Sequence, residues 1–138
     1  MLTDYQEITE DLNDFELKEV LPLVIKGFKT RMKKGQIGKS NSVTSATICR
    51  GVNRKLEIMI QKYTLQPVKL RKMIGVIRQM NYIPALCSCS SGYYVAETMS
   101  ELDSCIQSLE ERIRQQNRVL DALKKQKEVI TADLKKDV

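Results

Sequence analysis

Histidine and tryptophan are absent from this chain of 138 residues, and the aromatic residues amount to two Phe and five Tyr. Without His, the chain lacks the side chain that most often acts as a general base or a metal ligand near neutral pH. No run of eighteen apolar residues occurs, so we expect no membrane-spanning helix. The acidic residues 1–11 contain no apolar signal-peptide core, so we expect a cytoplasmic protein.

The usual marks of an active site are missing too. No Gly-rich loop suited to phosphate binding is present, and the basic segment 18–80 holds no pair of neighbouring carboxylates, since Glu57 stands alone in its stretch. A reaction needs a base, a nucleophile or an electrophilic group in a defined arrangement. We therefore expect no enzyme, no catalytic residues and no cofactor.

The four cysteines are Cys49, Cys87, Cys89 and Cys105, which are expected to be reduced thiols in a cytoplasm. Cys87 and Cys89 form a C-x-C motif and would share one face of a strand, whereas Cys49 has no C-x-x-C partner. We therefore expect small buried residues rather than zinc ligands. No neighbouring residue in the sequence is expected to lower a thiol pKa, which leaves redox sensing unsupported.

Charge is distributed very unevenly along the chain. Residues 1–17 carry six acids and no Lys or Arg, a net charge of −6, whereas residues 18–80 carry fifteen Lys or Arg and two acids, a net charge of +13. Residues 81–138 carry eight basic and nine acidic residues. So basic a segment attracts polyanions. Nucleic acid fits better than anionic lipid, because the charges are spread over a folded core rather than along one amphipathic anchor.

Local signals predict the first helix. It should begin after Asn13, with Glu16 completing a capping box. Pro22 should either kink this helix near Lys18 or divide it in two. The preceding residues 1–11 are expected to form a loose acidic arm.

A second helix should follow a flexible basic loop at residues 33–42. Thr44 is its expected cap, and it should run from about Ser45 to Lys62, with Gly51 as a point where it could be interrupted. Its apolar residues at helical spacing are Ile48, Val52, Leu56, Met59 and Ile60.

The segment Gln66–Asn81 predicts a short basic helix. Pro67 suits its first position, and Asn81 is a plausible left-handed stop before Pro84. Its apolar stripe is Leu70, Met73, Ile74, Ile77 and Met80. Two helices, a turn and a basic second helix are the ingredients of a helix-turn-helix.

After Pro84 the pattern becomes extended. Residues 85–89 and 93–98 resemble two strands joined by Ser90, Ser91 and Gly92. Gly92 supplies the positive φ that a tight hairpin needs. A hairpin directly after a recognition helix has the position of a wing. Because its tip carries no Lys or Arg, we expect it to contact phosphate through Ser hydroxyls and backbone N–H groups, or not at all.

A long helix is predicted after Thr98, which should form a capping box with Glu101. Beyond them, seam residues alternate spacings of four and three, the pattern of a coiled coil. Gln116 and Lys127 on this seam would fix register or oligomeric state at a cost in stability. The seam residues are Leu102, Ile106, Leu109, Ile113, Gln116, Leu120, Leu123, Lys127, Ile130 and Leu134. A helix of roughly 55 Å is too long to pack entirely on so small a domain. We therefore expect a homodimer, with strand orientation and higher oligomers left open.

If the helix at 66–81 enters a major groove, residues at its N-terminal end reach base edges first. Gln66, Lys69 and Arg71 are the candidates there, because Gln pairs with adenine and Arg with guanine. The other candidates are phosphate contacts by Lys72, Arg78, Arg50, Arg54 and Lys55, and backbone or minor-groove contacts by the loop residues Lys33, Lys34 and Lys39.

The sequence from Lys69 to Ile113 resembles small winged helix-turn-helix proteins with a C-terminal coiled coil that bacteriophages and bacterial mobile elements encode. The matching parts are Leu70–Lys72, Ile77–Arg78, Pro84, Gly92–Val95 and Leu102–Ile113, with a looser match at Phe15–Gly27. The resemblance implies a winged helix fold and a bacterial host cell. Most members of this group are uncharacterised, so it implies no specific task.

Together these patterns predict a mainly α protein with a small β-hairpin (α+β). An acidic arm (1–12) would precede a winged helix-turn-helix domain (13–98) and a coiled-coil helix (99–138). The predicted function is binding of double-stranded DNA, sequence-specific or structure-dependent, in phage or mobile-element regulation, replication or maintenance. The alternative is a protein-interaction module whose wing and coiled coil recruit an acidic host or phage partner. No membrane or small-molecule partner is expected.

Overall fold

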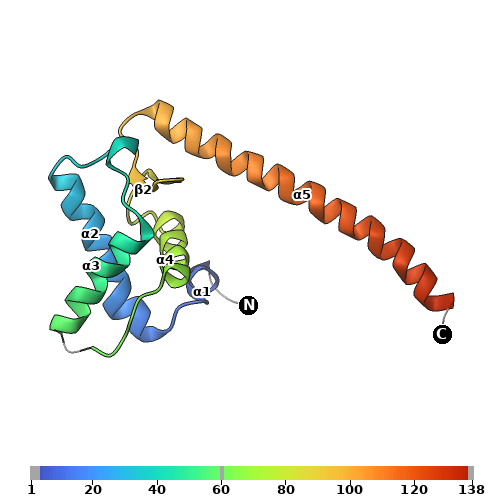
Figure 1. Ribbon diagram of the computed structural model, residues 1–138, viewed down its shortest axis with the longest axis horizontal. Coiled ribbons are helices and arrows are strands. Elements are labelled where there is room, and N and C mark those ends of the chain that lie inside the picture. The colour runs from blue at the N-terminus through green and yellow to red at the C-terminus, as the bar shows by residue number, and fades with distance from the viewer. Residues whose placement is uncertain (1–3, 60, 137–138) are drawn as a thin grey trace. The chain divides into compact units, whose positions relative to one another are not determined.

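The computed structural model describes residues 4–59 and 61–136, the last four of these by their backbone alone. The elements in chain order are α1 (Asp4–Thr9), the π-helical turn η1 (Glu16–Val20), α2 (Leu21–Lys33), the 3₁₀ turn η2 (Lys39–Asn41), α3 (Ser45–Ile58), α4 (Pro67–Gln79), β1 (Leu86–Cys89), β2 (Gly92–Val95) and α5 (Met99–Lys136) (Figure 1). The described chain is mainly helical with one small hairpin and a long C-terminal helix, which confirms that part of the prediction. It divides into two units, one up to residue 102 and one from residue 103.

Asn13 and Glu16 form the predicted capping box. The Asn13 N–H donates to Glu16 Oε1 over 2.9 Å, and the Glu16 N–H donates to Asn13 Oδ1 over 2.8 Å. The helical run that follows is continuous but changes type, because the π-helical turn η1 passes directly into α2 and Pro22 lies in the first turn of α2. A π-helical turn is wider than an α-helical one and gives room to the proline ring, which would otherwise meet the carbonyl of Lys18.

The expectation of a loose N-terminal arm was wrong for residues 4–9, which form helix α1. Thr9 is buried and its hydroxyl donates to the carbonyl of Tyr5 over 2.7 Å. Ile8 and Leu12 pack against the core, so the segment is held by apolar contacts that its acidic composition conceals.

Helix α3 begins and ends with identifiable contacts. Thr44 caps it, since its hydroxyl accepts from the Thr47 N–H over 3.2 Å. The helix is unbroken at Gly51 but stops at Ile58, before the predicted end. The side chain of Asn53 forms two hydrogen bonds with the backbone of the buried Leu65, of 2.6 and 3.1 Å. This clamp holds the chain between α3 and α4 in a non-helical path. Ile60, predicted to lie on the α3 stripe, falls outside the described residues.

Helix α4 follows the prediction, and the predicted hairpin forms, but β2 begins at Gly92 and ends at Val95 instead of running from residue 93 to 98. Pro67 is the first residue of α4, and Asn81 adopts a left-handed conformation with φ 56° just after it. In the hairpin Cys89 pairs with Gly92, so the turn consists of Ser90 and Ser91. Gly92 has φ +121°, and a Cβ there would lie 2.1 Å from the Val43 carbonyl oxygen.

Val43 pairs with β2 through a single-residue β-bridge, which the sequence did not predict. It forms an antiparallel bridge with Tyr93, with two backbone hydrogen bonds of 2.8 Å. The chain just before α3 is thereby joined to β2.

The core lies between α2, α3 and α4 and extends under the hairpin (Figure 1). Burial of this apolar surface is the main source of stability. Among the most deeply buried apolar side chains are Val20, Leu56, Leu65, Leu70, Met73 and Ile77.

Helix α5 has 38 residues, roughly 57 Å at about 1.5 Å per residue. Its predicted capping box forms only in part. The Glu101 N–H donates to the Thr98 hydroxyl over 3.2 Å, but the Glu101 carboxylate accepts from the backbone N–H groups of Glu97 and Lys39, each over 2.8 Å. None of the helices in the described part of the chain has both the length and the apolar character that crossing a membrane requires.

Candidate nucleic-acid interface

Helix α4 separates its residues by face. The inner stripe of Leu70, Met73, Ile74 and Ile77 is buried, as predicted, and Val76 is buried as well. On the outer side Val68, Arg71 and Lys72 are exposed, and Gln66 is exposed just before the helix. The first two turns of α4 therefore present a mixed polar, basic and apolar surface to solvent.

Two basic side chains of α4 contact the acidic N-terminal segment. Lys69 Nζ lies 3.4 Å from Glu16 Oε1 and donates to the Asp11 carbonyl oxygen over 2.5 Å. Lys72 Nζ lies 3.2 Å from Asp11 Oδ2, and both of these side chains are about half exposed. Lys69 is thus engaged within the chain, whereas an exposed pair such as Lys72–Asp11 contributes no more than about 1 kcal/mol.

Glu16 is the centre of a buried polar cluster. Its side chain is 2% exposed and accepts from the Tyr63 hydroxyl over 2.5 Å and from the Asn13 N–H. Burial acts to raise the pKa of Glu16, but the hydrogen bonds from Tyr63 and Asn13 and the charge of Lys69 together outweigh it, so that this pKa lies below its ordinary value. Burial and the Glu16 carboxylate raise the pKa of Tyr63. Glu16 is therefore an anion that Lys69 helps to neutralise.

Arg78, at the other end of α4, also faces the chain. Its Nε donates to the Leu86 carbonyl oxygen over 2.9 Å, which ties α4 to the start of β1. Its Nη2 is buried and has no hydrogen-bond partner among the described residues. The geometry gives Arg78 a structural contact rather than a free position on the surface.

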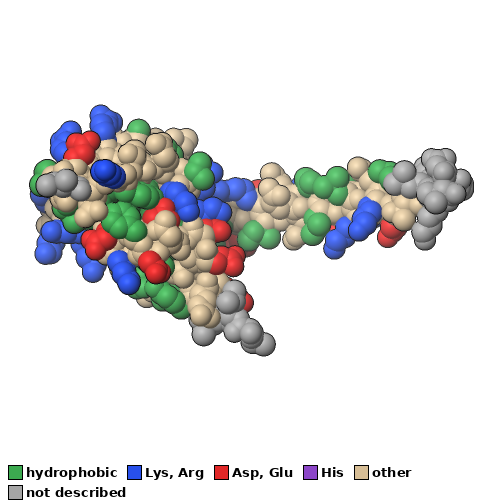
Figure 2. Space-filling model, turned by 90° about the horizontal axis from the view of Figure 1, so that it is seen from below, with side chains coloured by type: hydrophobic (Ala, Val, Ile, Leu, Met, Phe, Trp, Pro, Cys, Tyr) green, Lys and Arg blue, Asp and Glu red, His purple; other side chains and the backbone are tan. Residues whose placement is uncertain are grey.

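The six remaining candidate contacts are exposed: Arg50, Arg54 and Lys55 on α3, and Lys33, Lys34 and Lys39 around the loop before it. None of their side chains forms an ion pair with another described residue. Figure 2 shows Lys and Arg side chains at several separate places on the visible face of the first unit. Among the predicted basic residues, Lys69 and Arg78 are thus held by contacts within the chain, whereas these six are not paired with described acids.

A hollow of about 450 Å³ lies where the hairpin meets the first residues of α3 and α4. Its lining includes Thr44 and Ser45 from α3, Pro67 from α4, and Ser90 and Ser91 from the hairpin turn. Hydroxyl groups and the unpaired N–H groups of helix N-termini suit phosphate oxygens. We call this site the wing hollow.

A second hollow, of about 320 Å³, lies between α1 and α4. Glu7 and Asp11 line one side of it, and Arg71 and Lys72 line the other. Acidic groups of the N-terminal segment thus lie beside the basic residues that the sequence assigned to nucleic acid. The opposite charges of residues 1–17 and 18–80 were the only signal of this proximity.

In the second unit, α5 carries apolar side chains at the predicted spacing (Figure 2). Six of them are between 38% and 60% exposed: Ile106, Leu109, Ile113, Leu120, Leu123 and Ile130. Gln116 and Lys127 are exposed on the same helix, Leu102 at its start is half-buried, and the side chain of Leu134 lies outside the described residues.

All four cysteines are free thiols. Cys49 and Cys87 are buried, and burial raises the pKa of Cys49. Burial also acts to raise the pKa of Cys89, but a contact of 3.4 Å with the Ser42 hydroxyl and the backbone N–H of Ser91 outweigh it, so that this pKa is lowered. The sequence did not predict this effect, because Ser42 is distant along the chain. No group of three or more potential metal ligands occurs among the described residues.

Comparisons with protein-family models, with curated proteins and with solved structures give no match for this chain. A function is therefore inferred from the geometry of the chain itself. Two features missed by sequence analysis matter most: the wing hollow, and the acidic contacts of Lys69 and Lys72.

Proposed function

We propose that the protein binds double-stranded DNA through a winged helix-turn-helix unit. In this proposal α3 and α4 form the helix-turn-helix, α4 is the recognition helix and the β1–β2 hairpin is the wing. The order of elements supports it: a helix, a short strand position at Val43, two further helices and a hairpin that pairs with that position.

The observation that carries the proposal is the exposed first part of α4 beside the wing hollow. N-terminal residues of a recognition helix meet base edges in the major groove. Gln66 would pair with adenine, Arg71 with guanine, and the exposed Val68 would contact a thymine methyl group. Thr44, Ser90 and Ser91 in the wing hollow would hold a phosphate nearby.

The exposed seam of α5 supports a homodimer in this proposal. Apolar residues at heptad spacing pair with an equivalent helix when no core covers them. Two DNA-binding units on one stalk would contact two half-sites. The resemblance to proteins of phages and bacterial mobile elements supports a role in regulation, replication or maintenance of such an element in a bacterial cytoplasm.

Charge reversal on α4 tests the proposal. The double substitution Arg71→Glu with Lys72→Glu should weaken binding of a labelled duplex by about ten-fold or more, because a base contact and a phosphate contact are lost. Fluorescence anisotropy on the full-length protein, between about 50 and 200 mM salt, measures the affinity and the counterion release.

The matched control is Lys26→Glu with Lys29→Glu on α2, which makes the same change in net charge away from α4. Equal losses in the two variants would show attraction to the overall charge alone. An affinity that does not change with salt, or no binding at all, would refute the DNA proposal.

The contacts of Lys69 and Lys72 favour one alternative function. Both already hold acidic partners within the chain, Glu16 and Asp11, so the same surface suits carboxylates of another protein. In that case a partner would be retained after nuclease treatment while the purified chain bound no duplex.

A further inference from the structure

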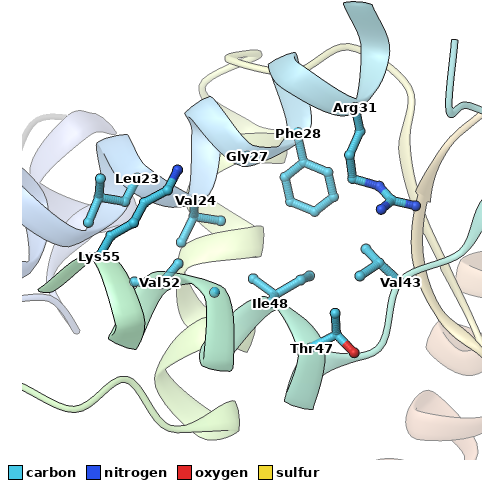
Figure 3. A pocket seen from close by; sticks show the side chains of 11 residues that line it. Leu23, Val24, Gly27, Phe28, Arg31, Val43, Thr47, Ile48, Val52 and Lys55 are labelled. Atoms are coloured by element: carbon cyan, nitrogen blue, oxygen red, sulfur yellow. The ribbon is translucent and has the colours of Figure 1, made fainter. Parts of the chain in front are cut away.

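An apolar groove of about 190 Å³ lies between α2 and α3, apart from the outer face of α4 (Figure 3). Leu23, Val24 and Phe28 from α2 and Ile48 and Val52 from α3 form most of its lining. Lys55 lies toward one end of it and Arg31 toward the other (Figure 3). We call this site the α2–α3 groove.

Two glycines keep the α2–α3 groove open. Gly27 lies within α2 and Gly51 within α3, and both line the groove. Glycine is the least favourable residue in a helix interior apart from proline. Neither glycine has a positive φ, and a Cβ at either position would meet nothing within 4 Å. Neither the backbone conformation nor the packing therefore requires glycine at these two positions. Both glycines border the open space of the groove.

The size and charge of the groove define what fits it. A cavity of about 150 Å³ lined by Leu, Ile and Phe binds benzene, so the α2–α3 groove has room for one bulky apolar side chain. Among its lining residues only Arg31 and Lys55 are charged, and both are basic. Arg31 also donates to the Asn41 carbonyl oxygen over 2.7 Å, which holds its guanidinium at this end of the groove. A ligand that fills the groove thus meets an apolar floor between cationic edges.

We propose that the α2–α3 groove binds a segment of a partner protein that presents a bulky apolar side chain flanked by Asp or Glu residues. The apolar side chain would lie between Gly27 and Gly51, and the carboxylates would pair with Arg31 and Lys55. DNA has charge to offer these edges, but the thymine methyl that it presents in the major groove is too small to fill the floor. The proposal does not depend on DNA binding by α4.

A displayed library of random twelve-residue peptides provides the probe. It is selected on the full-length protein, with counter-selection on the empty support only, and the enriched peptides are then measured on the variant Gly27→Leu with Gly51→Leu, whose own side chains fill the groove. The enriched peptides should carry a bulky apolar residue with neighbouring acids. They should bind the filled variant about ten-fold more weakly or worse, a loss of about 1.4 kcal/mol. The control Gly75→Leu makes the same change in α4, outside the groove, and should bind them like the natural chain.

Circular dichroism establishes that each variant is folded. If the filled variant is not, Arg31→Glu with Lys55→Glu replaces it, because reversed edges should repel acidic peptides while the floor stays intact. Peptides that bind the natural and the altered chains equally, peptides enriched without acids, or no enrichment would overturn the proposal. Loss of duplex binding in the filled variant would also overturn it, because the groove would then belong to the DNA surface.

Discussion

Glu16 shows how one side chain links the acidic and basic parts of this sequence. Its carboxylate completes the capping box with Asn13, accepts from the Tyr63 hydroxyl and pairs with Lys69. A buried carboxylate is tolerated only when such partners compensate for the lost hydration. The local half of this arrangement, the capping box, was predictable because its two residues are three positions apart. The contacts with Tyr63 and Lys69 were not, because they join residues 47 and 53 positions apart, and only the fold brings them together.

The contribution of Glu16 to the free energy of unfolding should depend on pH. Because its pKa is lower in the folded protein than the ordinary 4.5, the stabilisation is fully present above that pH and is lost as pH falls through the folded value. Glu16→Gln should reduce the free energy of unfolding by about 1–3 kcal/mol at neutral pH. The difference from the natural chain should shrink in acid.

Chemical denaturation at several pH values measures this difference. Glu19→Gln is the control, since Glu19 is exposed in the same turn. A difference between the natural chain and Glu16→Gln that stays constant down to pH values well below 4.5 would contradict the lowered pKa of Glu16.

Among the elements, the features predicted from residues close together in the sequence are the ones that the structure confirms. The Thr44 cap, the start of α4 at Pro67 and the turn at Ser90 and Ser91 each depend on neighbours within a few positions, and the structure confirms them. The early end of α3 results from the clamp between Asn53 and Leu65, and the Val43 bridge from pairing with Tyr93. Both are contacts between distant segments, which leave no periodic pattern in the sequence.

In the proposed DNA complex, helix α1 and the residues after it should weaken binding by α4. Glu7 and Asp11 lie across a hollow from Arg71 and Lys72, where they would repel an approaching phosphate. Neutralisation by Glu7→Gln with Asp11→Asn should raise duplex affinity by roughly two- to ten-fold, most strongly at low salt.

The matched control for this test is Asp4→Asn with Glu10→Gln, which removes the same charge from exposed positions that do not line the hollow. Equal gains in both variants would point to net charge, and no gain in either would show that the acidic segment leaves α4 accessible. Anisotropy titrations at two salt concentrations distinguish these results.

At the scale of the whole molecule, the described residues of the second unit form no core of their own. Their apolar seam is exposed over six residues, whereas helices in proteins gain most of their stability from packing of such a face. We expect the full-length protein to be a dimer by light scattering, and Leu120→Glu with Leu123→Glu to make it a monomer, because four carboxylates would meet on the seam.

Gln115→Glu with Ala122→Glu adds the same charges off the seam and should leave the dimer intact. An unchanged mass for the Leu120 and Leu123 variant would remove the coiled coil from the proposal. A change in mass for the control would indicate a different pairing face.

The bridge between Val43 and Tyr93 has a consequence for recognition. Val43 is buried, and the close approach of Gly92 to its carbonyl leaves no room for a larger residue at the start of β2. The hairpin is therefore a rigid extension of the chain that enters α3, and it has little freedom to adjust to what it touches. A ligand at this end of the protein would be selected by a preformed shape and would incur little entropic cost of ordering it.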